Sequence, residues 1–429
     1  MKTPTMRSLL TLGLLLAVAT WATAQTLQPE IGESQPNLKV YRLSGVEYSA
    51  QPQAINTPQS FTAIAFEIPE DQSYGKASVW VNGQELPLHA DPHRLPGEGN
   101  LSTLMSVEGP LTRFSISAPG WSQDLPVKVF LIHSGEAKVQ QPRKAENAAA
   151  CDFPPAIPQS EWRAGLTPPD PGRSFSDVNN LIVHHSAGSN TATNYTQVVR
   201  DIYVFHTQGR GWSDIGYNYV IAQNGDLYLA RDPEGGDQDR VIGAHFCGAN
   251  TGTMGVCLLG DYTNVVPPDT MLGTLELVLA WKAYKDEMDP LATASHRLNA
   301  NLGVIAGHRD GCATECPGGQ TYARLDEMRQ RVADRMAVCD GPEPEPVDSV
   351  AIYRITSTTR NIRIFTNLPY RFSITETRLI DMQGRVHVVP WQPHPLATWE
   401  LELGQFHPGV YVLHYVVAGE VRRQRIRVL

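Results

Sequence analysis

Two segments that cannot build a packed core divide this chain of 429 residues into three folding units. Residues 140–150 are polar and then rich in alanine, and residues 340–347 alternate acidic side chains with proline. A proline-alternating segment is extended and semi-rigid, so it separates domains. We therefore expect domains at residues 25–139, 151–339 and 348–429.

The N-terminus has the pattern of a secretory signal peptide. Lys2 and Arg7 precede an apolar run at residues 9–21, and small residues at 22–24 suit cleavage after Ala24. The run is shorter than the ~18 residues of a membrane span, which favours a signal peptide over an anchor. We expect a mature chain without a transmembrane segment. It would pass through the periplasm to the cell surface or the medium, where cysteines can pair.

The charge balance argues against nucleic acid as a partner. The chain has 44 acidic and 35 basic residues, a formal net charge of -9. A protein that binds a polyanion normally carries a basic excess. The hydrophobic fraction of 41% is ordinary for a globular protein.

The first and last units contain only strand patterns, and no catalytic cluster is recognisable in the first. We expect an N-terminal accessory domain resembling a β-sandwich and a small C-terminal β-sandwich. Asn82-Gly83 predicts a hairpin turn. The strands that support this reading are at residues 61–68, 77–81, 127–132, 411–417 and 421–428.

The middle unit alternates strand and helix patterns, which predicts an α/β domain with a mixed central sheet flanked by helices. Expected helices cover residues 195–205, 271–279 and 325–336. Expected strands cover residues 181–183, 214–222, 227–230, 254–260 and 303–306.

Three side chains of the middle unit are suited to one metal ion. His184 and His308 each follow a short strand, and Cys316 lies a few residues after the second histidine. In open α/β sheets, ligands bind at the carboxyl ends of strands. Two imidazoles and a thiolate suit Zn²⁺, and three protein ligands leave a fourth position for a water whose pKa the metal lowers toward ~7. The pattern predicts a catalytic zinc site, with a disulfide as the alternative for Cys316.

Six motifs of the middle unit occur in the order found in one enzyme family. Over about residues 158–338, the chain resembles the type-2 N-acetylmuramoyl-L-alanine amidases, which include the peptidoglycan recognition proteins. The resemblance implies hydrolysis of the amide between the lactyl group of N-acetylmuramic acid and the L-Ala of the peptidoglycan stem peptide. The motifs are EWRA (161–164), IVHHSAG (182–188), GRGWSDIGYNYVI (209–221), GAH (243–245), MGVCLLGDY (254–262) and GHRDGCATECPG (307–318).

The resemblance assigns zinc to the same three ligands, His184, His308 and Cys316. It also places Tyr217 beside the water on the metal, and alternation would put Tyr217 on one strand face with Tyr219 and Ile221. His185 is expected to be structural, because adjacent strand residues face opposite ways.

Thr314 occupies a position where phage members of the family carry Lys and animal members carry Thr. As a catalytic residue, Thr314 is expected to contribute a hydroxyl hydrogen bond to the water or to the carbonyl oxygen, and the adjacent Glu315 should point away from the metal. Residues in the motifs around the groove are expected to bind substrate: His206, Arg210, Trp212, His245 and Asn250.

The same fold also occurs in receptors that bind peptidoglycan without cutting it. Such receptors typically lack the ligand cysteine, often replacing it with Ser, so Cys316 favours an enzyme. The expected cofactor is Zn²⁺ and the expected partner is a peptidoglycan muropeptide, bound by a monomeric chain. Neither the stem-peptide preference nor the ligand of the accessory domain is encoded in a recognisable motif.

Of six cysteines, five remain if Cys316 binds zinc, which permits at most two disulfides. Cys151 and Cys339 open and close the middle unit, so a bond between them is expected. Cys247 with Cys257 is the second expected pair, although spacing alone does not fix connectivity.

The last domain resembles the C-terminal sorting domain of type IX secretion substrates of the Bacteroidota. The resemblance implies the type IX secretion machinery as a partner. A wall-binding β-module is the alternative, and the position at the extreme C-terminus favours sorting. The matching segments are LIDMQGRV (379–386), PGVYVL (408–413) and VRRQRIRV (421–428).

Overall fold

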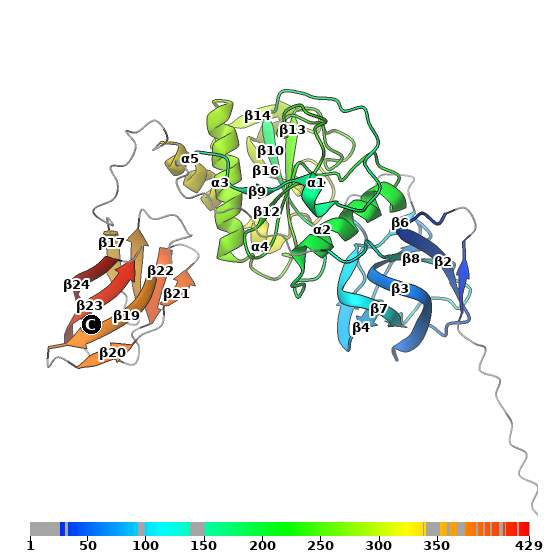
Figure 1. Cartoon of the computed structure of the whole chain (residues 1–429), viewed down its shortest axis with the longest axis horizontal. Helices are drawn as coiled ribbons and strands as arrows, with labels where there is room; N and C mark the ends of the chain where they lie inside the picture. Colours follow the sequence, from blue (N-terminus) through cyan, green and yellow to red (C-terminus); the bar gives the residue numbers. More distant parts are fainter. Residues whose placement is uncertain are drawn as a thin grey trace, which may run out of the picture.

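The computed structural model places most of the chain (Figure 1). The expected signal peptide and both expected linkers lie outside the described residues. The described residues are 26–30, 33–92, 99–137, 151–337, 339, 352–357, 361–366, 374–382, 385–388, 391–394, 397–402, 406–407, 409–417 and 420–428.

The accessory domain is one antiparallel sheet. The expected β-sandwich would have two separate sheets, whereas the strands here form a single hydrogen-bonded sheet. Register shifts around Phe61 interrupt the pairing of its two longest strands, and such irregularities bend strands. The hairpin at Asn82-Gly83 is confirmed, and both residues have positive φ. The strand order is β1 (Thr26–Pro29), β2 (Leu38–Ser44), β8 (Val127–Ile132), β3 (Gln53–Ile68), β7 (Met105–Ser117), β4 (Ser78–Val81) and β5 (Gln84–Pro87), with β6 (Asn100–Leu101) paired to β3.

The middle domain has the expected mixed sheet. Its strand order is β16 (Ile305–Gly307), β10 (Asn180–His185), β13 (Thr253–Leu258), β11 (Tyr219–Ile221), β12 (Leu227–Leu229) and β9 (Ala156–Ile157). The first four strands in this order are mutually parallel, β12 is antiparallel to β11, and β9 is parallel to β12.

Helices cover both faces of this sheet, as expected. Helices α3 (Asp269–Lys285) and α5 (Leu325–Met336) pack on one face, and α2 (Tyr195–Val204) packs on the other. Short elements that the sequence did not indicate complete the domain: α1 (Gln159–Trp162), a π-helical turn (Phe205–Gly209), β14 (Thr293–His296), β15 (Asn299–Gly303), a 3-10 turn (His308–Asp310) and α4 (Gly319–Tyr322).

The expected strand at residues 214–222 is wrong over most of its length, since β11 covers only Tyr219–Ile221. The predicted alternation, which placed Tyr217 and Tyr219 on one face, is therefore wrong as well. Tyr217 packs in the core on the α2 side, whereas Tyr219 packs on the α3 side. Just before the strand, Asn218 donates its side-chain amide to the carbonyl of Val241. The backbone at this point is held by the Asn218 side chain, so regular alternation begins only after it.

The accessory and middle domains share one hydrophobic core. Leu38 and Phe130 of the accessory sheet pack in the same cluster as Val199 and Ile202 of α2. Polar contacts cross the same interface, because buried Asp201 of α2 accepts hydrogen bonds from Thr62 (2.8 Å) and Ser134 (2.6 Å) of the accessory domain. The helix is thus enclosed between two sheets (Figure 1).

The last domain contains two four-stranded antiparallel sheets, and their packing as a sandwich stays a prediction. The first sheet has the order β17 (Ile352–Ser357), β18 (Asn361–Thr366), β22 (Ala397–Glu402) and β21 (Trp391–His394). The second sheet has the order β20 (Val386–Val388), β19 (Ile374–Asp381), β23 (Gly409–Val417) and β24 (Glu420–Val428). The expected final hairpin is confirmed as β23–β24.

Among the described residues, every helix is too short or too polar to span a bilayer.

Burial of Asp201 makes the two-domain unit sensitive to pH. Desolvation raises the pKa of Asp201 to about 6, although hydrogen bonds from Ser134, Thr62 and Gln197 oppose the shift. The folded state therefore binds this proton more tightly than the unfolded state. The corresponding stability is complete below about pH 4 and is lost as the pH rises through about 6.

Asp201→Asn should remove this pH dependence, because the amide keeps the shape of the acid without ionising. Between pH 4.5 and 7.5, wild-type protein should lose about 2 kcal/mol of unfolding free energy relative to the variant. Urea unfolding at the two pH values measures the difference. Equal pH dependence in the two proteins would contradict the raised pKa.

Candidate metal centre and groove

His184, His308 and Cys316 meet in one buried cluster. Their possible ligand atoms all lie within 4.8 Å of one another, and each residue is 0% exposed. The Cys316 Sγ lies 3.7 Å from His184 Nδ1, and the two imidazole centroids are 4.6 Å apart. The structure thus brings together the three residues that the sequence selected.

Parallel strand pairing explains how the two histidines meet. In the register of β10 and β16, Val183 pairs with Gly307, so the next residue of each strand reaches the same sheet edge. His184 and His308 are those next residues.

The loop after His308 brings in Cys316. The backbone N–H of Arg309 donates to the Cys316 carbonyl (3.0 Å), and the N–H of His185 donates to Cys316 Sγ (3.4 Å). Gly318 then turns the chain with φ +87°, and a Cβ there would lie 2.4 Å from the backbone of Tyr262. A side chain larger than hydrogen at this position would displace the loop that holds Cys316.

The donor set fits a zinc ion. Two imidazoles and one thiol are the ligand types that zinc prefers, and three such ligands leave one position open. Burial raises the pKa of the Cys316 thiol well above its ordinary value, opposed by the His185 N–H and by Arg309. A cation beside the sulfur is therefore what would stabilise a thiolate here.

A second group of donor atoms lies next to the first, formed by Cys247, Cys312 and the shared His308. Cys247 and Cys312 form a disulfide, so their sulfurs are not available as thiolates. The expected Cys247–Cys257 bond is wrong, because Cys257 lies inside the sheet in β13 as a free, buried thiol. The expected Cys151–Cys339 bond is confirmed.

His245 and Asn250, expected to bind substrate, lie behind His184. His245 Nδ1 is 3.0 Å from His184 Nε2, and His245 is 2% exposed. Asn250 Oδ1 accepts the backbone N–H groups of His245 and Phe246, both at 2.8 Å. The pair therefore orients the His184 ring, a role that no spacing along the chain indicates.

Three other expected site residues, Tyr217, His206 and Trp212, form a row of aromatic rings that begins next to His184. Arg210 lies at the far end of this row. The Tyr217 ring centroid lies 5.4 Å from that of His184, and His206 follows at 5.7 Å from Tyr217. Trp212 lies 4.6 Å from His206, and the Arg210 guanidinium lies 4.6 Å above the Trp212 ring. Burial raises the pKa of Tyr217 well above its ordinary value, so its hydroxyl keeps its proton.

Three further residues lie near the cluster. The expected hydrogen bond from the Thr314 hydroxyl to water or to a carbonyl oxygen stays a prediction, and in the structure Thr314 Oγ1 accepts the backbone N–H of Cys316 at 3.1 Å. The Glu315 side chain is 84% exposed and points away. His185 Nδ1 accepts the backbone N–H of Tyr262 at 3.2 Å, which is a structural role.

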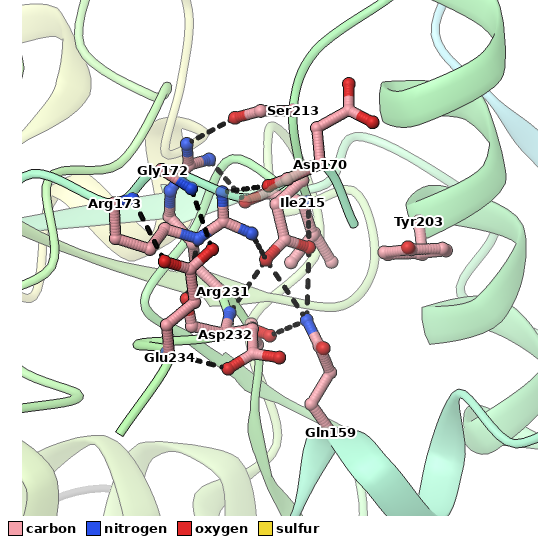
Figure 2. A network of polar contacts seen from close by, with 12 residues as sticks. Gln159, Asp170, Gly172, Arg173, Tyr203, Ser213, Ile215, Arg231, Asp232 and Glu234 are labelled. Carbon is pink, nitrogen blue, oxygen red and sulfur yellow. Dashed lines mark hydrogen bonds and ion pairs between the residues drawn. The ribbon is translucent and has the colours of Figure 1, made fainter. Parts of the chain in front are cut away.

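The segment that carries Trp212 and Tyr217 is fixed by a buried carboxylate that sequence reasoning missed. Asp214 accepts hydrogen bonds from Gln159 (3.0 Å), from Arg173 (3.0 Å) and from the backbone N–H of Asp232 (2.7 Å). Figure 2 shows these partners converging from separate segments of the domain. The only sequence signal was a lone acidic residue inside the GRGWSDIGYNYVI motif.

The middle domain is similar to one protein family and to several known proteins. The profile of a family described as N-acetylmuramoyl-L-alanine amidase matches residues 174–319. Peptidoglycan-recognition protein LB of Drosophila melanogaster is 31% identical over 172 residues, which cover 39% of this chain and 66% of that protein, just under two thirds. Peptidoglycan-recognition protein SC1a/b of Drosophila simulans is 30% identical over 148 residues, covering 34% and 70%.

Two further likenesses involve a human protein and a solved structure. The N-acetylmuramoyl-L-alanine amidase of Homo sapiens is 28% identical over 176 residues, covering 40% of this chain and 28% of that protein. The structure of wild-type Drosophila PGRP-LB is 27% identical and aligns with a TM-score of 0.32, covering 45% of this chain and 98% of that chain.

Through its middle domain, the chain therefore belongs to the family of N-acetylmuramoyl-L-alanine amidases and peptidoglycan-recognition proteins.

Proposed function

We propose that this protein is a secreted, zinc-dependent N-acetylmuramoyl-L-alanine amidase. It would hydrolyse the amide that joins the lactyl group of N-acetylmuramic acid to the L-Ala of the stem peptide. The observation that carries the proposal is the completely buried cluster of His184, His308 and Cys316. Relatives named as amidases and as peptidoglycan-recognition proteins support the substrate class.

When bound, zinc would supply an activated water and polarise the substrate carbonyl. His184, His308 and Cys316 would hold the ion, and His245 keeps the His184 ring oriented through their 3.0 Å contact. Tyr217 retains its proton because it is buried, so it is a hydrogen-bond donor for an oxygen that becomes negative. Thr314 stabilises the ligand loop through the Cys316 N–H.

Cys316→Ser should remove zinc and abolish hydrolysis while the domain stays folded, because a neutral hydroxyl is a poor zinc ligand of similar shape. Metal analysis and release of free stem peptides measure the two losses, and circular dichroism checks the fold. Cys257→Ser, at the other free buried cysteine, should keep its zinc. Near-full activity of Cys316→Ser would show that the assigned metal site is wrong.

The same measurements separate the enzyme from a receptor on the same fold. Wild-type protein that lacks zinc, releases no stem peptide and still binds peptidoglycan would establish the receptor. The buried cysteine favours the enzyme, because a receptor has no need of a third metal ligand.

Tyr217→Phe should lower kcat by roughly tenfold to a hundredfold with KM changed less than about twofold, since the lost hydrogen bond strengthens in the transition state. Zinc content should be unchanged, because Tyr217 is not a ligand. Steady-state kinetics on a soluble muropeptide tests the expectation. A raised KM at constant kcat would assign Tyr217 to ground-state binding instead.

We propose that the last domain directs export through the type IX secretion machinery, after the signal peptide has brought the chain to the periplasm. This proposal rests on the three motifs at residues 379–386, 408–413 and 421–428. The last two include β-strand sequence of the final hairpin, β23–β24.

A chain ending at Asp340 should keep its amidase activity in vitro and accumulate in the periplasm of the native host. Export would fail because the sorting domain is absent, whereas the catalytic residues are all retained. Cell fractionation and assays on insoluble sacculi measure the two properties. Normal export combined with weaker binding to sacculi would show that the domain is a wall-binding module.

A further inference from the structure

The accessory domain has an open groove of its own, lined only by accessory residues. Its volume is about 440 Å³, and it lies between the β4–β5 hairpin and the second half of β7. Asn82, Thr112 and Arg113 line it with exposed side chains, and Trp80 lines it with a half-buried ring. The groove therefore combines an aromatic surface with polar groups that face solvent.

Strand register explains why the ring and the polar groups lie together. Trp80 of β4 pairs with Ser115 of β7, and Arg113 lies two residues before Ser115. The neighbouring Val79 and Ile116 point the other way, into the core of the accessory domain. Because side chains alternate along a strand, Trp80, Ser115 and Arg113 share the sheet face opposite that core.

The hairpin that lines the groove also contacts the middle domain. Asn82 lies in the groove, and two residues later Gln84 Oε1 accepts a hydrogen bond from the Thr191 hydroxyl at 3.2 Å. Thr191 belongs to the loop that follows β10, the strand that carries His184. The groove thus borders a loop of the candidate metal centre.

Two further contacts hold the accessory domain in one position on the middle domain. Asp91 and Arg210 form an ion pair at 2.9 Å, and their side chains are 6% and 2% exposed. Glu108 of β7 accepts the backbone N–H of Thr193 at 2.6 Å. Because these contacts come from separate segments of the accessory domain, the groove has a fixed place relative to the metal cluster.

The lining of the groove matches the chemistry of a glycan. A pyranose ring presents an apolar face of C–H groups, which an indole ring can cover, and a rim of hydroxyl and acetamido groups, which pair with polar side chains. Within the described part of the chain, the side chains of Asn82, Thr112 and Arg113 form no hydrogen bond or ion pair, so they are available to a ligand.

The charge of Arg113 points to the glycan of peptidoglycan in particular. Hydrolysis of the lactyl–L-Ala amide adds water across the C–N bond, which frees the amine of L-Ala and leaves a carboxylate on the lactyl group. Strands trimmed by an amidase are therefore anionic. A guanidinium binds a carboxylate through two parallel hydrogen bonds, so Arg113 is a suitable partner for this group.

We propose that this groove is a glycan-binding subsite, in which the Trp80 ring stacks on a sugar and Arg113 pairs with a lactyl carboxylate of the same strand. The inference rests on the proposed function, because that function supplies the strand. The accessory domain holds the glycan while the middle domain removes stem peptides from it. Attachment at this second point raises the concentration of uncut amides at the middle domain.

The test measures binding of peptide-free glycan strands to the full-length protein by titration calorimetry. Trp80→Ala should weaken binding by roughly tenfold or more, because the stacking surface is lost. Arg113→Ala should weaken it by roughly threefold to tenfold, because the charge-assisted hydrogen bonds are lost. Arg42→Ala is the matched control, since it removes an exposed arginine from β2, where Arg42 pairs with Glu30 outside the groove. Its affinity should stay within about twofold of the wild-type value.

Wild-type protein that does not bind the strands would overturn the inference, and so would an Arg113→Ala variant that binds within twofold of wild type. Equal losses in Arg113→Ala and Arg42→Ala would also overturn it, since the effect would then be one of net charge. Arg113 is exposed, so this pair of variants decides the matter even where Trp80→Ala fails to fold.

Failure of the proposed function gives a different result. The strands contain no stem-peptide amide, so their binding is measured independently of hydrolysis. Wild-type protein that binds them through Trp80 and Arg113 but releases no stem peptide from peptidoglycan would contradict the amidase and leave the glycan subsite in place.

Discussion

The parallel pairing of β10 with β16 is the constraint on which the candidate site depends. It brings two strands, separated in sequence by more than half of the middle domain, to a common edge. His184 and His308 come next on each strand, and the loop that follows His308 returns Cys316 to the same point. The sheet core behind them is fully buried, so the ligand positions are set by packing that cannot relax at small cost.

Several layers of the fold support this cluster. His245 orients His184, and Asn250 holds the backbone of His245. Asp214 fixes the segment between Trp212 and Tyr217, and the accessory domain encloses α2 on its outer face. The accessory domain is therefore part of the structure that supports the candidate site.

Local sequence patterns were enough to predict that His184, His308 and Cys316 come together, and to predict the three long helices α2, α3 and α5. His184 lies near the carboxyl end of one short apolar strand and His308 directly follows another, and both strands are visible in the sequence. The face of Tyr217 was predicted wrongly, because Asn218 interrupts the alternation through a bond to the distant Val241. The Cys247–Cys312 pair and the Asp91–Arg210 pair depend on how loops and domains pack, which spacing along the chain does not encode.

X-ray absorption at the zinc edge of the purified protein, together with the zinc content per chain, tests the assignment of the metal centre. We expect one zinc per chain, with one sulfur neighbour at about 2.3 Å and two imidazole nitrogens at about 2.0–2.1 Å. Two sulfur neighbours would instead indicate that the Cys247–Cys312 disulfide is reduced and that both cysteines bind the ion. That result, or protein that binds no zinc, would contradict the assignment of His184, His308 and Cys316 as the metal centre.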